Sequence, residues 1–165
     1  MLGAAQTAPI IMSDEPMFAI VDTTGNALRF DRFAYERSLE SARGDWHDAN
    51  WVRCRITLNV SRATKQSVDA ELLTTEIVEL SNILRATLSS FGAEQTFEPT
   101  EPYIKLRIAR RDTHVNIGAR LDLAPAVGPV IEFVFECRPE EIGATLDAIG
   151  RVHEAFPERL TQSGT

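Results

Sequence analysis

The densest group of side chains that could do chemistry lies at His47, Asp48 and Asn50, directly before Trp51. A histidine beside a carboxylate can act as a general base or begin a metal site. Both chemistries need more than these residues supply, namely a nucleophile or further ligands. A structural role is the simpler interpretation, in which Asp48 or Asn50 caps the start of the next strand through backbone hydrogen bonds. We therefore predict no active site at this position.

Other residue types that react or bind metals are scattered along the chain. Cys54 and Cys137 each lie within an apolar run, which favours two buried free thiols over a disulfide. His114 and His153 are distant in sequence from each other, and packing roles suit both better than metal binding. The sequence has no glycine-rich phosphate loop, no G-x-S-x-G elbow, no Cys-x-x-Cys pair and no His-Glu-x-x-His motif. We expect no catalysis, no cofactor and no metal.

Alternation of apolar and polar residues predicts most of the strands. Between Val52 and Val60 every second residue is apolar, and the residues between them are polar. This period of two marks a strand with one buried and one solvated face. The predicted strands begin with a hairpin and cover residues 17–21, 27–35, 51–60, 68–72, 103–110, 114–123 and 130–137.

Two segments have apolar residues at spacings of three and four, which is the pattern of an amphipathic helix. In the first, Thr74 or Thr75 can cap the start and Gly92 supplies a stop. In the second, Pro139 suits the first turn and Pro157 closes the helix. The predicted helices cover residues 74–91 and 139–156, and the polar residues 36–50 are predicted to form a loop.

These elements fit one architecture of the α+β class. The helices must bury their apolar stripes, and the apolar face of a mostly antiparallel sheet offers the surface for this. We therefore predict two layers, with two amphipathic helices packed on one face of the sheet. The predicted domain spans 17–158, between a flexible leader at 1–16 and a flexible tail at 159–165. The other face of the sheet would be open to solvent and would carry Arg53, Arg55, Lys105, Arg107, Arg120, Glu132 and Glu136.

The composition excludes several classes of partner. The chain has 165 residues, 44% of them hydrophobic and 25% charged, which is ordinary for one globular domain. Its net charge of −7 argues against nucleic acid, because phosphate backbones are bound through clustered lysine and arginine. No apolar stretch approaches the roughly 18 residues of a membrane-spanning helix. The N-terminal residues lack the basic region of a signal peptide. We expect a cytoplasmic protein with no membrane partner.

The charges are unevenly distributed along the chain. Residues 69–101 contain seven acidic residues and one basic residue, whereas residues 51–68 contain four basic residues and no acidic one. The pattern predicts acidic helices on one layer and a partly basic strand face on the other. Such faces can be ordinary solvated surfaces with weak cross-strand ion pairs. Alternatively, one of them is a docking surface for another protein, because charged patches steer association.

Three short motifs and the end of the last helix carry a resemblance to a known family. The motifs are Asp-Ala-Asn-Trp-Val at 48–52, Leu-Leu-Thr-Thr-Glu-Ile at 72–77 and Phe-Glu-Pro-Thr-Glu-Pro-Tyr at 97–103. With the helix that ends at Phe156 and Pro157, they resemble the WapI-family immunity proteins and their bacterial relatives, over roughly residues 17–158. The resemblance implies a protein that binds a cognate toxin domain stoichiometrically and neutralises it, without a cofactor. It identifies no binding residues.

Two other functions remain open at the level of sequence. One is a small-molecule binder or enzyme that uses the polar sheet face together with the loop at His47 and Asp48, which would require a concave pocket. The other is a homodimer of unknown role, formed through a sheet edge or the open face. The first would bring histidine and carboxylates together around a cleft. The homodimer would require no reactive site.

Overall fold

The computed structural model describes residues 15–61 and 64–160, so the predicted leader lies almost wholly outside the described residues, as does most of the predicted tail. Described in chain order, the elements are β1 (Phe18–Val21), β2 (Ala27–Tyr35), α1 (Leu39–Ala42), α2 (Trp46–Asn50), β3 (Trp51–Val60), β4 (Thr64–Leu73), α3 (Thr74–Ser89), β5 (Glu94–Phe97), β6 (Ile104–Arg111), β7 (His114–Asp122), β8 (Val130–Cys137) and α4 (Pro139–Ala155).

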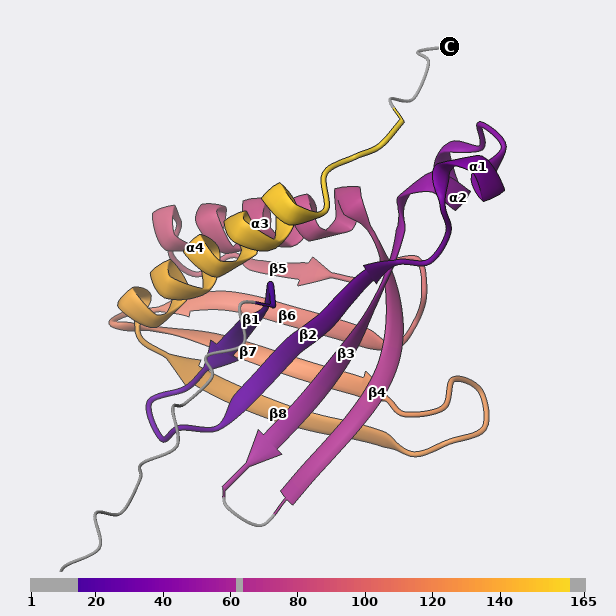
Figure 1. Ribbon diagram of the computed structural model, residues 1–165. Helices are drawn as coiled ribbons and strands as arrows, with labels where there is room; N and C mark the ends of the chain where they lie inside the picture. The colour runs from indigo at the N-terminus through magenta and orange to yellow at the C-terminus, as the bar shows by residue number, and fades with distance from the viewer. Residues whose placement is uncertain (1–14, 62–63, 161–165) are drawn as a thin grey trace, which may run out of the picture.

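The strands form two antiparallel sheets of four strands each. The first sheet has the order β1-β2-β3-β4 and the second has the order β5-β6-β7-β8. The chain thus passes twice through four strands followed by a long helix, with α1 and α2 inserted between β2 and β3. In Figure 1 the first sheet lies in front of the second, and α3 and α4 run side by side above both. The α+β class is confirmed, while the predicted open sheet is divided into two.

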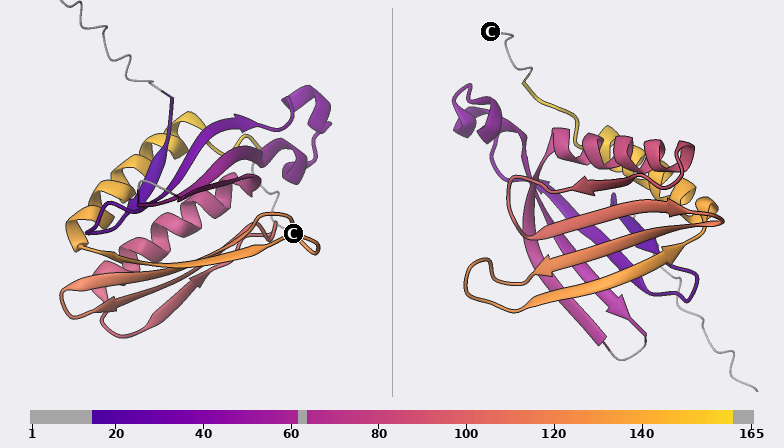
Figure 2. Two further views of the ribbon diagram at one scale, coloured as in Figure 1. Left: turned by 90° about the horizontal axis from the view of Figure 1, so that it is seen from below. Right: turned by 180° about the vertical axis from the view of Figure 1, so that it is seen from behind.

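The inner faces of both sheets and the two long helices share one hydrophobic core. Phe18 of β1 stacks on Phe30 of β2, with ring centroids 4.4 Å apart. Ile108 and Phe135 contribute to the same core from the second sheet, and Leu84 contributes from α3. Figure 2 (left) shows the two sheets as separate layers, with the helices beyond the space between them. Each sheet therefore buries one face and turns the other outward.

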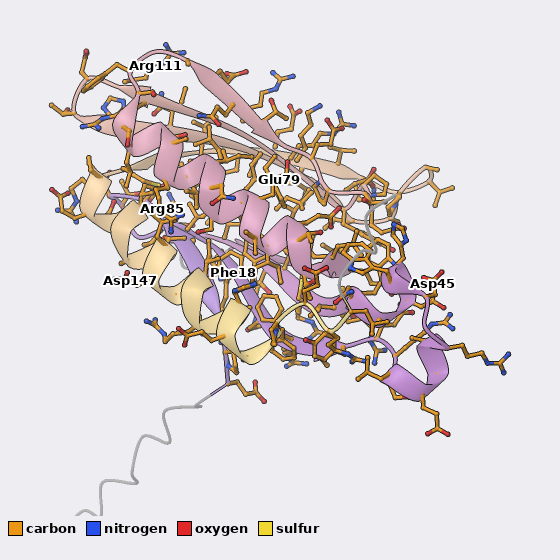
Figure 3. All side chains as sticks on the ribbon, turned by 90° about the horizontal axis from the view of Figure 1, so that it is seen from above. Phe18, Asp45, Glu79, Arg85, Arg111 and Asp147 are labelled. Atoms are coloured by element: carbon orange, nitrogen blue, oxygen red, sulfur yellow. The ribbon has the colours of Figure 1, made fainter. Side chains whose placement is uncertain are left out.

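The long helices follow the predicted amphipathic stripes. Ile77, Leu80 and Leu84 are buried on α3, and Ile142 and Ile149 are buried on α4. The view onto the helices in Figure 3 shows the opposite sides, where the exposed residues Glu79, Arg85 and Asp147 are turned away from the sheets.

The start of α3 differs in detail from the prediction. Leu73 occupies the N-cap position, and its backbone N–H donates to Oε2 of Glu76 over 2.8 Å. Thr74 is the first helical residue, and its hydroxyl donates to Asn50 Oδ1 over 3.4 Å. A glutamate three residues after the cap can satisfy the cap N–H on its own, so no threonine cap is needed.

Three other segments depart from the predicted elements. Residues 36–50 contain the short helices α1 and α2 in addition to loops, because Ser38 and Asp45 cap them with side-chain oxygens. β4 begins at Thr64 and extends the predicted strand 68–72 at its N-terminal end. β5, which pairs with β6, was not predicted, because Glu94–Phe97 is short and contains only one buried residue.

A β-bulge interrupts β2. Asp31 pairs with Arg55 and Ala34 with Arg53, so β2 has one residue more than β3 between these pairs. Arg32 absorbs the extra residue with a φ of 56°, in the left-handed region that ordinary residues seldom adopt. The bulge turns Phe33 toward Phe18, whose ring centroid lies 6.0 Å away.

Candidate functional site

The outer face of the second sheet collects most of the charged residues that the alternation predicted to be solvent-facing. The strand register places Lys105, Arg120 and Glu132 in one cross-strand row. The next row contains Arg107, Gly118 and Val134. Side chains alternate along each strand, so these residues point away from the core. Figure 2 (right) looks onto this face.

A hollow of about 430 Å³ lies on this face. Gly118 is in the middle of its row and has no side chain. A Cβ placed there would come no closer than 3.9 Å to any described residue other than its chain neighbours, so the space directly above the glycine is open. The residues that line the hollow are Lys105, Arg107, Gly118, Ala119, Arg120, Glu132, Phe133 and Val134.

The charged groups around the hollow are unequally satisfied. Lys105 Nζ forms an ion pair with Glu98 Oε2 over 2.7 Å. Within the described ranges 15–61 and 64–160, neither guanidinium of Arg107 and Arg120 forms a hydrogen bond or an ion pair within the fold, and neither does the carboxylate of Glu132. Unsatisfied guanidiniums on a rigid sheet are suited to bind carboxylates of a partner.

The hollow continues toward the start of β6. A smaller adjoining hollow of about 200 Å³ shares Lys105 and Arg120 with it and reaches Asp122. One carboxylate oxygen of Asp122, Oδ1, is buried without a hydrogen-bond partner in the described part of the chain. A buried acceptor without a partner is costly unless a bound group satisfies it. The smaller hollow and Asp122 therefore extend the surface available to a partner along the row of Arg120.

The remaining residues of the predicted face lie elsewhere. Arg53 and Arg55 are on β3 and face outward from the first sheet. Arg55 forms two hydrogen bonds with the carboxylate of Asp69, at 2.8 and 3.3 Å. The hydrogen bond from Arg55 lowers the pKa of Asp69. This arginine is therefore already satisfied within the fold, unlike those on the second sheet.

Glu136 belongs to the second sheet but lies outside the hollow. Its carboxylate is 3.8 Å from Nε2 of His114, and its backbone oxygen accepts a hydrogen bond from Thr23. The seven residues of the predicted face are consequently split, with two on the first sheet and five on the second. Four of these five line the hollow: Lys105, Arg107, Arg120 and Glu132.

The residues at 47–50 form a structural cluster. His47 is exposed on α2, and its ring packs edge-on against Trp46 at 5.0 Å. Asp48 lies 3.4 Å from Arg37. The helix is capped by Asp45, whose Oδ1 accepts from the N–H of Asp48, and this replaces the predicted strand cap by Asp48 or Asn50. No residue of α2 lines the hollow on the second sheet.

Asn50 has a different role from the one predicted. Its side chain is completely buried and donates to the backbone oxygen of Trp46 over 2.9 Å. It also accepts from the backbone N–H of Arg159 over 2.8 Å. The guanidinium of Arg159 stacks over the ring of Tyr35 at 4.0 Å. Arg159, which the predicted domain boundary assigned to the tail, therefore packs against the body of the protein.

The two thiols are free and buried, as the sequence predicted. Burial raises the pKa of both Cys54 and Cys137 to about 12, so both are protonated and unreactive at neutral pH. Among the described residues, no group of three or more histidine, cysteine, aspartate or glutamate side chains is arranged to hold a metal ion.

Sequence analysis did not identify the apolar part of the candidate surface. Val134 and Val130 are exposed on β8, at 64% and 42%, and Gly118 forms the floor of the hollow. Gly118 offered a signal, because a glycine within a strand commonly marks a place where another chain or ligand approaches closely. The alternation along β8 put Val130 and Val134 on the same side as Glu132 and Glu136, but an apolar side chain is not by itself a sign of an exposed face.

The fold and this face define a small α+β domain that presents a charged, hollowed sheet surface. The chain belongs to the immunity protein WapI-like family, whose model matches residues 19–157. This confirms the resemblance inferred from the motifs. The comparison with curated proteins gives no match, and the comparison with solved structures gives none. In the part of the chain that the structure describes, no helix is both long and apolar enough to span a membrane.

Proposed function

We propose that this protein is a non-catalytic immunity protein that neutralises a cognate toxin domain by stoichiometric binding in the cytoplasm. Membership of the immunity protein WapI-like family supports the class. The observation that carries the binding mode is that Arg107 and Arg120 lie beside an open hollow and have no hydrogen-bond or ion-pair partner among the described residues. Arginine is enriched among the residues that dominate protein interfaces.

The outer face of the second sheet is the proposed toxin-binding surface. It combines unpaired charge with the exposed apolar side chain of Val134, whereas Arg55 on the first sheet is neutralised by Asp69. A surface that combines arginine with exposed apolar side chains has the composition of many interfaces between proteins. Carboxylates on the toxin would bind Arg107 and Arg120.

A ligand-binding function has one observation in its favour. The hollow of about 430 Å³ falls within the range of small-molecule sites. An anionic ligand could bind the two arginines there. The lining comes from residues of one sheet, without a second element to enclose a ligand, and this favours a macromolecular partner.

The test uses the toxin domain encoded by the gene next to that of this chain. The domain is expressed in cells with and without the full chain, and purified mixtures are analysed by light scattering. We expect restored growth and a complex of one chain with one toxin domain. We also expect toxin activity to fall in proportion to added chain and to vanish at equimolar amounts.

Two results would count against stoichiometric neutralisation. Loss of toxin activity at far less than equimolar chain would indicate turnover and therefore an enzyme. Continued killing without any complex, or a neighbouring gene that encodes no toxin domain, would remove the basis for the proposed partner.

A further inference from the structure

β8 is an edge strand with two exposed valines, Val130 and Val134. It pairs with β7 on one side and is the last strand of the second sheet. In Figure 1 it forms the lower border of the rear sheet, on the side opposite the helices. An edge strand presents backbone N–H and C=O groups that can pair with another chain.

The hydrogen-bond pattern shows which residues of β8 present those groups. In an antiparallel pair, opposite residues alternate between those that bond to each other and those whose backbone groups point away. The N–H of Leu123 donates to the oxygen of Pro129 over 3.1 Å, which makes this a bonded pair. Bonded and non-bonded pairs alternate along the register from this pair onward. Val130, Glu132 and Val134 belong to non-bonded pairs, so their backbone N–H and C=O groups point away from β7.

The contact of Glu136 agrees with this count. Its backbone oxygen accepts from the N–H of Thr23 over 3.0 Å, so Glu136 also faces away from β7. Within the described residues, this is the one backbone hydrogen bond made to the outer edge of β8. The turn after β1 therefore covers one end of the edge and leaves the segment from Val130 to Val134 for a partner.

The other edge strands are covered by a helix or carry no exposed valine pair like that of β8. β1 packs against α4, and β5 is only four residues long and packs against α3. β4 carries Lys65, Asp69 and Glu71 along its length. Charges, short length and covering helices are the usual protections of sheet edges. On β8, the outward-facing residues alternate between exposed valine and glutamate.

We propose that an extended segment of the toxin adds to β8 as a fifth strand of the second sheet, with alternating apolar and basic residues on the face it shares with the hollow. The inference rests on the proposed function and adds the mode of binding. Apolar side chains would lie opposite Val130 and Val134. A lysine or arginine would lie opposite Glu132, whose carboxylate has no partner among the described residues, because opposite charges favour cross-strand pairs.

A second copy of this chain fits the edge less well. The antiparallel register that aligns Val130 with Val134 of another copy places Glu132 opposite its own equivalent. The register that aligns Val134 with itself places Glu132 opposite Glu136. Like charges directly opposite each other destabilise a pair of strands. In the registers that align valine with valine, the glutamates therefore favour a basic partner strand over a second copy.

Amide hydrogen exchange of the full chain tests the proposed contact. In the free chain, the N–H groups of Glu132 and Val134 should exchange quickly, and those of Ile131 and Phe133 should exchange slowly because they are bonded to β7. Addition of the toxin domain from the neighbouring gene should slow the exchange of Glu132 and Val134 by about 100-fold or more. Unchanged exchange at these amides in a formed complex would overturn the inference.

Substitutions at Val134 separate backbone pairing from side-chain contact. Val134→Pro removes an N–H that points away from β7 and has no backbone partner in the described part of the chain, whereas Val134→Ala removes the valine side chain and keeps the N–H. We expect the Kd of Val134→Pro for the toxin domain to be at least about tenfold above that of Val134→Ala. Glu132→Lys should raise the Kd by a similar factor. Thermal unfolding verifies that each variant is folded.

The outcomes distinguish this inference from the proposed function. If the wild-type chain fails to bind the toxin domain, the proposed function fails and the inference with it. If the wild type binds and the two Val134 variants have the same Kd as each other, only the strand-addition inference fails. A dimer of the chain alone, with Glu132 and Val134 already protected from exchange, would show that a second copy occupies the edge and would also overturn it.

Discussion

At the residue scale, the polar side chains with most contacts support the fold rather than chemistry. Asn50 is buried and its amide joins α2, α3 and the chain after α4, through Trp46, Thr74 and Arg159. The sequence identified Asn50 as a structural residue but placed its contacts at the start of the next strand. Two of its partners, Thr74 and Arg159, are 24 and 109 residues away along the chain, which local patterns do not reveal.

Replacement of Asn50 tests this role. Asn50→Ala should lower the free energy of unfolding by about 2–3 kcal/mol, because the hydrogen bonds of the buried amide to the backbone groups of Trp46 and Arg159 are lost. Urea denaturation measures the change. The exposed helix residue Asn82 provides the control, and Asn82→Ala should change stability by less than about 0.5 kcal/mol. Equal effects of the two substitutions would contradict the role assigned to Asn50.

Asp22 gives the fold a dependence on acidic pH. Burial acts to raise its pKa, but hydrogen bonds from Asn26 and Thr24 outweigh burial and lower the pKa below that of an ordinary aspartate. Oδ1 accepts from the backbone N–H groups of Thr24 and Asn26, both at 2.9 Å. The ionised form is therefore favoured in the folded state. Its stabilisation is fully present above the unfolded-state pKa of about 4 and is lost as the pH falls through the folded-state pKa.

The isosteric variant Asp22→Asn tests this dependence. At pH 7 it should lower the free energy of unfolding by about 1–2 kcal/mol, because charge-assisted hydrogen bonds in the turn between β1 and β2 are weakened. Denaturation curves between pH 7 and pH 3 should show the difference from wild type shrinking as the wild-type carboxylate protonates. A difference that stays constant over this range would exclude the ionised carboxylate as its source.

At the element scale, the periodicity of apolar residues predicted the long helices and most of the strands, but it did not predict every boundary. The strands 51–60 and 130–137 agree with the structure because their alternation is long and regular, and the bounds of the strand 27–35 also agree. The bulge in β2 was not predicted, since the extra residue, Arg32, interrupts the pattern without a glycine to mark it. β5 was missed because its pairing with β6, rather than its own four residues, makes it a strand.

Glu76 links the start of α3 to the segment before β6. Its Oε2 accepts from the N–H of Leu73 over 2.8 Å, and its Oε1 accepts from the N–H and the hydroxyl of Thr100, both over 2.7 Å. The carboxylate is buried at the junction between the two halves of the chain. One side chain thus caps the helix and fixes the approach to the second sheet.

Glu76→Ala should therefore lower the free energy of unfolding by about 2–4 kcal/mol, since it leaves buried backbone donors unsatisfied and removes the helix cap. The matched control is Glu79→Ala, at an exposed position on the same helix, which should cost less than about 0.5 kcal/mol. Thermal or urea unfolding measures both. Similar losses for the two variants would show that Glu76 acts only through helix propensity or general charge.

At the scale of the whole molecule, the sequence predicted the class and the outward-facing residues, but not their separation onto two faces. Alternation determines which side of a strand is polar, and it contains no information about which strands pair. Arg53 and Arg107 therefore looked equivalent in sequence, although one lies on the first sheet and the other beside the hollow of the second. The division of the strands at α3 depends on long-range packing across the shared core.

The account depends most on the claim that the outer face of the second sheet recognises the toxin. The direct test is titration calorimetry of the neighbouring-gene toxin domain against two double variants, Arg107→Ser with Arg120→Ser on the second sheet and Arg53→Ser with Arg55→Ser on the first. We predict that the first pair raises Kd by about 100-fold or more, and that the second pair changes it less than about twofold. Equal losses, or a loss confined to the variant of the first sheet, would contradict the account.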